Sequence, residues 1–273
     1  MSYSRAGRGY TKPRPGSRVN WGHSVALKLE GAWLFNEASG LSINDSSNKY
    51  ISALGVSLGW KAIAGFPDSG ADFDGSGSYA QVPSRTILFP ASIFVKTSFN
   101  SAVGTYTFIG HTNDASTGYR LTLIGGVPAF TLSGVANYSF TSFPAVVVGR
   151  MYSFLVSIEG DAATGYWKDH TTGLTYTQTL TIGTMLGTTL GFIDFGRRIG
   201  VTPTYLAGQI VHAFLWSRVL ASRDFDSLVT EPYAMIQPVT YRRRFVSAAG
   251  VTMDTWFTQH APHRAKPEIV MHA

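Results

Sequence analysis

The stretch that most constrains the fold is residues 208–232, GQIVHAFLWSRVLASRDFDSLVTEP. Its first part, residues 209–216, is apolar at nearly every position, and a strand of that composition must be covered on both faces. The second part predicts a short helix with one apolar stripe, in which Ser222 is the expected N-cap and Pro232 ends the segment. The chain therefore needs a sheet that is packed on both sides, with the helix supplying part of the cover.

A second strand with two apolar faces lies at residues 31–37, GAWLFNE. We expect it to lie beside residues 209–216 and to close the fold, although the two are far apart in the sequence. Between them run about twelve short segments of alternating or apolar character, bounded by Gly, Asn, Asp or Pro. This spacing predicts an all-β fold, an antiparallel jelly-roll-like β-sandwich with one short C-terminal helix.

Composition fits a β-rich chain that is stabilised by burial alone. Of 273 residues, 29 are glycine, 13% are aromatic and only 14% are charged, which is typical of a turn-rich globular domain and not of a disordered chain. With no cysteine, the chain forms neither a disulfide nor a thiolate site. Its start lacks the apolar segment of a signal peptide, and no apolar run is long enough to span a bilayer, so we expect no membrane partner.

Positive charge is concentrated at the two ends. Residues 1–29 carry six basic groups and no acid, and residues 239–273 carry five basic groups and two acids. Residues 30–238 carry eleven basic and fourteen acidic groups, so the net charge of +6 belongs to the ends and the body is mildly acidic. We therefore expect an extended N-terminal arm at 1–23, a β-sandwich at 24–238 and an extended C-terminal arm at 239–273. The arms would bind partners through Arg5, Arg8, Arg14, Arg18, Arg242, Arg243 and Arg244.

Four segments, in the correct order, resemble the concanavalin A-like lectin/glucanase superfamily in its laminin G-like branch. GAWLFNEASG with the later NDSSN turn is similar to the opening strand of that family, and ADFDGSGSYAQVP to its Phe-Asp-Gly segment. RMYSFLVSIEGDAATGYWKD resembles a strand pair of the family, and LAGQIVHAFLWSRVLASRDFDSLVTEP its closing strand and helix. The resemblance covers roughly residues 24–238 and implies a sandwich of the same kind, whereas function has to be argued separately.

The flanks RPGSRVNWGHSVALKLEGAWLFNE and EPYAMIQPVTYRRRF are similar to those of laminin G-like proteins encoded by tailed bacteriophages. That resemblance implies a structural protein of the virion, such as a decoration, fibre or tail-associated protein, made in the host cytoplasm. Its partners would be other virion proteins, including copies of itself, to which the arms anchor it. Binding of a host surface glycan, as an adhesin, is the alternative. Nucleic acid is less favoured, since arginines separated by Pro, Gly and Tyr suit a protein surface equally well.

No catalytic signature stands out, and we expect the chain not to be an enzyme. Glucanases of the resembled superfamily carry carboxylates at i, i+2 and i+4 of one strand. The nearest match is Glu159 and Asp161, with Ala163 in the third position, and a turn at the end of a strand explains it. His260 and His263 lack the further ligands of a zinc site.

Two further sites rest on residue type alone. A glycan site would use an exposed aromatic ring beside polar groups, for which Tyr119, Trp167 and Asp169 are the candidates, with packing of Trp167 on the sheet as the alternative. We expect no cofactor. A calcium ion, if one is bound, would take oxygen ligands from Asp72, Asp74 and Asp114, although turns account for these residues equally well.

Overall fold

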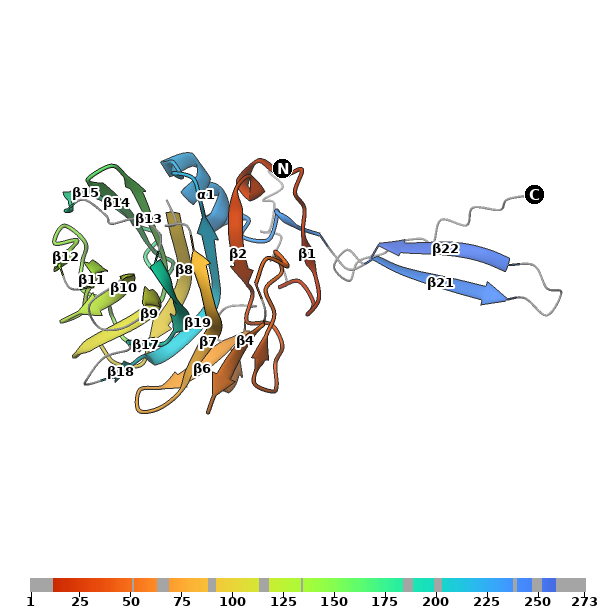
Figure 1. Ribbon diagram of the computed structural model, residues 1–273, viewed down its shortest axis with the longest axis horizontal. Coiled ribbons are helices and arrows are strands. Elements are labelled where there is room, and N and C mark those ends of the chain that lie inside the picture. The colour runs from red at the N-terminus through yellow and green to blue at the C-terminus, as the bar shows by residue number, and fades with distance from the viewer. Residues whose placement is uncertain are drawn as a thin grey trace, which may run out of the picture.

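Two eight-stranded antiparallel sheets pack face to face in the computed structural model of the protein (Figure 1). The structure describes residues 12–50, 52–62, 69–87, 92–112, 118–133, 135–183, 189–198, 203–237, 240–246 and 252–258. The expectation of an all-β antiparallel sandwich with one short helix is confirmed. In the described part of the chain, no helix is long and apolar enough to cross a membrane.

We call the first sheet sheet A. Its strand order is β12-β11-β10-β9-β16-β7-β4-β3, and each neighbouring pair is antiparallel. In chain order its strands are β3 (Ser42–Ile43), β4 (Ala53–Val56), β7 (Tyr79–Ile87), β9 (Thr105–Thr112), β10 (Gly118–Ile124), β11 (Val127–Leu132), β12 (Ala136–Ser139) and β16 (Thr189–Phe195). A small hairpin of β17 (Arg197–Arg198) and β18 (Thr204–Tyr205) follows β16 and contacts β9.

We call the second sheet sheet B. Its order is β15-β14-β13-β8-β19-β6-β5, and β2 also pairs with β19. Its strands are β2 (Leu29–Trp33), β5 (Gly59–Ala62), β6 (Ser69–Asp74), β8 (Ser92–Phe99), β13 (Met151–Glu159), β14 (Ala162–Asp169), β15 (Thr175–Thr181) and β19 (Ala207–Trp216). One edge of β19 pairs with β8 along its length, while the other edge pairs with β6 and then with β2.

The two strands with apolar faces are neighbours, as the sequence predicts. In the antiparallel pair β2–β19, Ala213 lies opposite Trp33 and Leu215 lies opposite Gly31. Alternate residues of β19 enter different cores, so that Leu215 belongs to the core between the sheets and Phe214 to a second core. Strand β19 is therefore covered on both faces, which explains its apolar sequence.

The core between the sheets is rich in aromatic rings. Tyr152 and Trp167 stack with centroids 4.7 Å apart, and Trp167 meets Phe154 edge-on at 5.4 Å. All three rings are almost completely buried. Burial of each such side chain contributes about 1.5–3 kcal/mol to stability, so this cluster replaces the disulfides that the chain cannot form.

A third layer covers the outer face of sheet B (Figure 1). It consists of helix α1 (Ser222–Thr230), the 3-10 turn η1 (Ser24–Ala26) and the short pair β1 (Arg18–Val19) with β20 (Ile236–Gln237). Phe225 and Leu228 of α1 are buried in the second core with Val25 and Met235. The predicted helix is therefore present, and its apolar stripe faces the sheet.

The N-terminal cap of α1 differs from the expectation. Ala221, not Ser222, occupies the N-cap position. The carboxylate of Asp224, in the first turn, accepts the backbone N–H of Ala221 at 3.0 Å. The orphan donor at the start of the helix is thus satisfied by an acidic residue three positions later, as in half of a capping box.

Residues 12–23, which the sequence assigns to the N-terminal arm, lie against the sandwich. The Nζ of Lys12 donates to the carbonyl oxygens of Phe35 and Ser69, and Val19 is buried in the second core. At the other end, β21 (Thr240–Val246) and β22 (Thr252–Thr258) form an antiparallel hairpin where the sequence predicts an extended arm. Figure 1 shows this hairpin apart from the sandwich.

Candidate ligand-binding site

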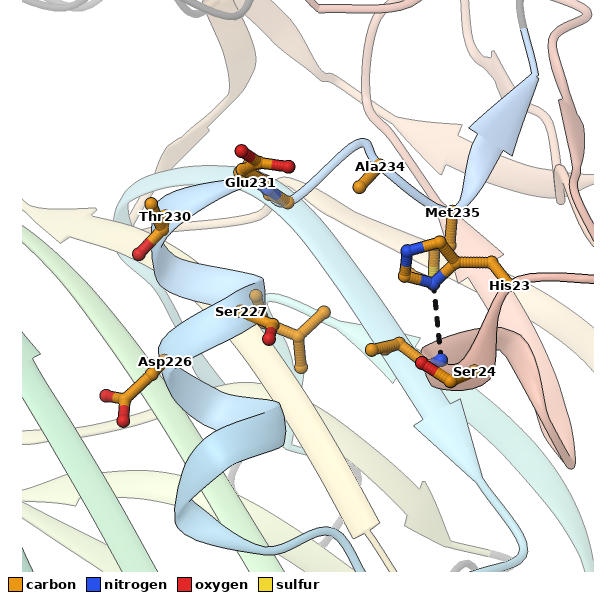
Figure 2. A pocket seen from close by; sticks show the side chains of 11 residues that line it. His23, Ser24, Asp226, Ser227, Thr230, Glu231, Ala234 and Met235 are labelled. Atoms are coloured by element: carbon orange, nitrogen blue, oxygen red, sulfur yellow. Dashed lines mark hydrogen bonds between the residues drawn. The ribbon is translucent and has the colours of Figure 1, made fainter. Parts of the chain in front are cut away.

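A cleft of about 440 Å³ lies in the third layer, between helix α1 and the turn η1. Figure 2 shows Asp226, Ser227, Thr230 and Glu231 on the α1 side and His23 on the opposite side. Residues about two hundred positions apart in the sequence thus form its two walls. A concave site of this volume is large enough for a small organic ligand such as a sugar unit.

The rim of the cleft is polar and its floor is apolar. The side chains of Asp226, Ser227, Thr230 and Glu231 are exposed at the rim, as is Ser24 on the opposite wall. The floor is made of four buried side chains, Val25, Leu228, Pro232 and Met235. Apolar surface with a few convergent polar groups is the composition typical of small-molecule sites.

His23 is held in one orientation by the start of η1. Its Nδ1 accepts the backbone N–H of Val25 at 3.2 Å, and its backbone carbonyl accepts the N–H of Ala26 at 2.9 Å. In the neutral ring the proton then lies on Nε2, because a nitrogen that accepts a hydrogen bond carries no proton. His23 therefore presents a donor to the cleft, and Figure 2 shows this second nitrogen on the side that faces α1.

The opposite wall supplies acceptors. The cleft lies at the C-terminal half of α1, where helix carbonyl groups give a negative partial charge. Glu231 adds a carboxylate at the end of this wall, whereas Figure 2 shows the carboxylate of Asp226 on the side of α1 turned away from His23. A ligand with several hydroxyl donors fits this wall, because carboxylates accept up to four hydrogen bonds each.

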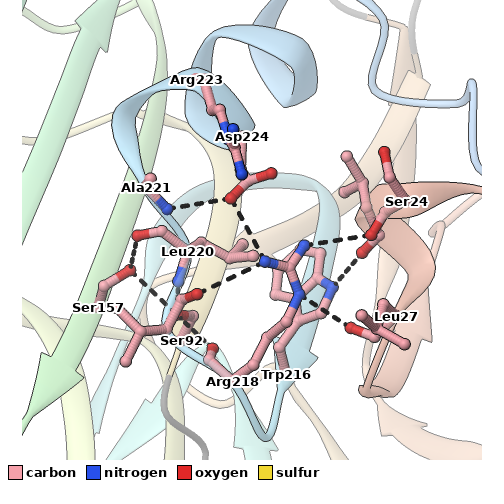
Figure 3. Close-up of polar contacts among 12 residues, drawn as sticks. Ser24, Leu27, Ser92, Ser157, Trp216, Arg218, Leu220, Ala221, Arg223 and Asp224 are labelled. Atoms are coloured by element: carbon pink, nitrogen blue, oxygen red, sulfur yellow. Dashed lines mark hydrogen bonds and ion pairs between the residues drawn. The ribbon is translucent and has the colours of Figure 1, made fainter.

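Arg218 fixes the separation of the two walls (Figure 3). Its Nε donates to the carbonyl of Leu27 at 3.0 Å and its Nη2 to that of Ser24 at 3.3 Å, while its Nη1 lies 3.4 Å from the carboxylate of Asp224. Trp216 adds a buried hydrogen bond from Nε1 to the carbonyl of η1 residue Val25, at 2.7 Å. The cleft is therefore preformed by contacts that join η1, the end of β19 and α1.

The predicted glycan residues do not form a surface site. Tyr119 on β10 and Trp167 on β14 are 1% and 0% exposed, so both rings belong to the core between the sheets. Asp169 accepts the N–H groups of the following turn and pairs with Arg150 at 2.9 Å. These contacts lower the pKa of Asp169, although burial opposes them. The prediction of a glycan site at these three residues is wrong, because their side chains face the interior or build a turn.

The predicted calcium ligands are not brought together either. One carboxylate oxygen of Asp74 accepts three backbone N–H groups of the turn 76–78 and the hydroxyl of Ser78. These hydrogen bonds hold the pKa of Asp74 far below its usual value and explain the residue as a turn former. Asp72 is half-buried on β6, and Asp114 lies outside the described residues. Over the ranges that the structure describes, no three acidic or histidine side chains form a metal-binding group.

The arginines assigned to partner binding are only partly described. Arg14 and Arg18 are exposed, and Arg18 lies opposite Gln237 in the pair β1–β20. Arg242, Arg243 and Arg244 are consecutive on β21, which pairs with β22. Arg5 and Arg8 lie outside the described residues.

The residues of the cleft were missed by sequence reasoning. In the sequence, Asp226 is only one of several acids in the predicted helix, and Glu231 is only the residue before Pro232. No local pattern marks His23. The one available signal was that α1 must pack beside the start of the domain, which does not specify which side chains line the gap.

Comparisons with known proteins give the fold and no family. No protein-family model matches the chain, and no curated protein matches it by sequence. The fold is similar to a Trypanosoma rangeli sialidase in complex with sialic acid, with a TM-score of 0.54 and 13% identity, over 76% of this chain and 33% of that chain. It is also similar to domain 4 of AbnA, a GH43 extracellular arabinanase from Geobacillus stearothermophilus, in complex with arabinotriose. That match has a TM-score of 0.52 and 14% identity, over 73% of this chain and 97% of that domain.

A receptor binding domain is a further match, with a TM-score of 0.50 and 12% identity, over 74% of this chain and 50% of that chain. The present chain spans about a third of the length of the sialidase chain. At these identities the likeness shows a shared β-sandwich fold and nothing more.

The expectation that the chain is not an enzyme is contradicted by these comparisons. Sialidases are among the solved structures that resemble it. Membership of this fold therefore does not separate binding proteins from enzymes, and the fold by itself assigns neither role.

Proposed function

We propose that the chain binds carbohydrate in the cleft between α1 and η1. The observation that carries this proposal is the composition of the cleft, with a carboxylate, hydroxyls and an imidazole around a floor of apolar side chains. A sugar ring offers hydroxyl groups for hydrogen bonding at its edge and C–H groups for apolar contact on its faces. The polar rim of the cleft can bond to the hydroxyl groups, and the apolar floor can contact the C–H groups.

The comparisons support the class of ligand. The arabinanase domain that shares the fold was solved with arabinotriose, and almost its whole length is matched. The sialidase was solved with sialic acid. Carbohydrate is therefore a class of ligand that accompanies this sandwich in other proteins, and the cleft is where this chain offers room for it.

Calorimetric titration of the full chain with a panel of neutral and acidic oligosaccharides tests the proposal. For the ligands that bind, Glu231→Gln should weaken the affinity about tenfold, since it removes a charge-assisted hydrogen bond, whereas Asp226→Asn should weaken it less because that carboxylate is turned away from His23. Glu159→Gln, which changes an exposed carboxylate at the end of β13, is the matched control and should leave the affinity unchanged. Equal affinities of all four proteins would show that sugar binding, if present, lies elsewhere.

We also propose that the chain is a component of a bacteriophage particle, made in the host cytoplasm and anchored to other virion proteins or to copies of itself. The resemblance of its flanks and the hairpin that carries Arg242–Arg244 apart from the sandwich support this role. The division into an arm, a sandwich and a second arm belongs to this proposal. Deletion of residues 1–11 or 239–273 should reduce incorporation into particles, and full incorporation of both truncated chains would refute the anchoring role.

A further inference from the structure

A second polar cluster lies on the outer face of sheet A, on the opposite side of the sandwich from the cleft. Four residues lie side by side in register on four neighbouring strands: Arg120 on β10, Gly110 on β9, Asp194 on β16 and Gln81 on β7. The residue next to Arg120 on β10, Tyr119, belongs to the core, so these four positions lie on the outer face.

Arg120 is buried, and two of its guanidinium nitrogens find no partner among the described residues. Its side chain is 4% exposed, and its Nε and Nη1 atoms make no hydrogen bond. It lies across Gly110, where a Cβ would come within 2.8 Å of the Arg120 Cγ. A guanidinium group that loses its hydration and gains no hydrogen bond is costly, so its position requires an explanation.

The charge that acts on the pKa of Arg120 has the same sign. Burial and, second, the guanidinium of Arg198 lower the pKa of Arg120 to about 10. Arg198 is half-buried on β17, and its own Nε makes no hydrogen bond. Strand β17 contacts β9, the strand that the Arg120 side chain crosses at Gly110, so two arginines with unused donors lie on the same part of sheet A, a disposition that attracts an anion.

The neighbouring carboxylate is already engaged with a third arginine. Asp194 is 1% exposed, and one of its oxygens accepts from Arg197 at 2.6 Å and from Gln81 at 3.1 Å. Arg197 also lies over the ring of Tyr79, 3.5 Å from its centroid. In the part of the chain that the structure describes, neither Arg120 nor Arg198 forms an ion pair with a carboxylate.

We propose that Arg120 and Arg198 bind the oxyanion group of a ligand on the outer face of sheet A. The group is a carboxylate, a sulfate or a phosphate, each of which accepts several N–H donors from two guanidinium groups. Gln81 and Tyr79 on β7 are half-buried and hold the neighbouring Asp194 and Arg197. The ligand would be an acidic sugar, recognised by its carboxylate, or a free inorganic anion. This site is independent of the proposed carbohydrate cleft.

The test is a calorimetric titration of the full chain with four probes: sodium glucuronate, glucose as its neutral counterpart, inorganic sulfate and inorganic phosphate. We expect saturable binding of at least one anion and none of glucose at this site. Arg198→Gln should weaken that binding about tenfold or more, and Arg120→Met should abolish it, since each removes charge-assisted hydrogen bonds.

Arg150→Gln is the matched control, because Arg150 pairs with Asp169 on sheet B. It should bind the anion as the wild-type chain does. Tighter binding of glucuronate than of the inorganic anions would assign the site to an acidic sugar, and the reverse order would assign it to a free anion. If Arg120→Met does not fold, the anion affinity of Arg198→Gln still tests the proposal, because Arg198 is only half-buried. No saturable binding of any anion, or unchanged binding by Arg198→Gln, would overturn the proposal.

Discussion

His212 should make the stability of this protein depend on pH. His212 is 0% exposed on β19, and its ring packs nearly parallel to those of Phe94, at 5.5 Å, and Phe214, at 5.1 Å. Its Nδ1 lies 3.2 Å from the hydroxyl of Tyr233. Burial, followed by the positive charge of Lys96, keeps the pKa of His212 well below 6.5. The imidazole is therefore neutral in the folded protein.

The sign and size of the effect follow from proton linkage. Below pH 6.5 the unfolded chain binds a proton at His212 that the folded chain does not bind, so acidification favours unfolding. The loss is about 1.4 kcal/mol per pH unit until the folded-state pKa is reached. From pH 6.5 to pH 5.0, His212 alone should then remove about 2 kcal/mol. Lys12 and His170 also repel a charge at this position and act in the same direction.

Urea unfolding of the wild-type chain and of His212→Phe at pH 7.5 and pH 5.0 measures this loss. The phenylalanine keeps the stack with Phe94 and Phe214 and removes the titrating group. Any cost of the lost contact to Tyr233 is the same at both pH values, because a tyrosine hydroxyl does not titrate there. Carboxylates elsewhere act equally in both proteins. We expect the wild type to lose about 2 kcal/mol more than the variant, and equal losses would refute the assignment of a neutral His212.

Three substitutions and one control test the fold itself by thermal and urea unfolding. Gly208→Ala should destabilise the chain by several kcal/mol, because its Cβ would come within 2.1 Å of the Ser98 carbonyl oxygen. The control Gly77→Ala should change stability little, because no atom lies within 4 Å of the added Cβ. Asp45→Ala should cost about 3 kcal/mol or more, since four backbone N–H groups donate to its buried carboxylate. Trp167→Ala should cost about 3–5 kcal/mol and leave sugar affinity unchanged in the fraction that folds, because the ring belongs to the core.

The pairing of the two closing strands could be predicted because the cause, apolar residues on both faces, is visible within each segment. A segment that is apolar on both faces can be satisfied only inside a layered structure, and the partnership of β2 with β19 followed from that requirement. Helix α1 was predictable for the same reason, since its apolar stripe needs a sheet. The residue that caps the helix could not be predicted. Ser222 and Asp224 are both good capping residues, and only the backbone conformation determines where the helix begins.

The faces of the weaker strands were not predictable. Strand β14 alternates buried and half-buried positions, and Trp167 lies on the buried side. Its sequence, AATGYWKD, offers one large ring on each face, so the pattern does not specify which ring faces the core. The cleft was invisible for a different reason. His23 and Glu231 line the same cleft only because α1 and η1 pack on the same face of sheet B. Packing between segments so far apart in the sequence leaves no local pattern.

The central claim is that the cleft between α1 and η1 binds carbohydrate. Amide NMR spectra of the isotope-labelled chain, recorded during titration with arabinotriose and with N-acetylneuraminic acid, test it most directly. Saturable shifts at Ser24, Ser227, Thr230 and Glu231, with the core strands unaffected, are the predicted result. An unchanged spectrum at the cleft with both sugars, or saturable shifts confined to another surface, would contradict the claim.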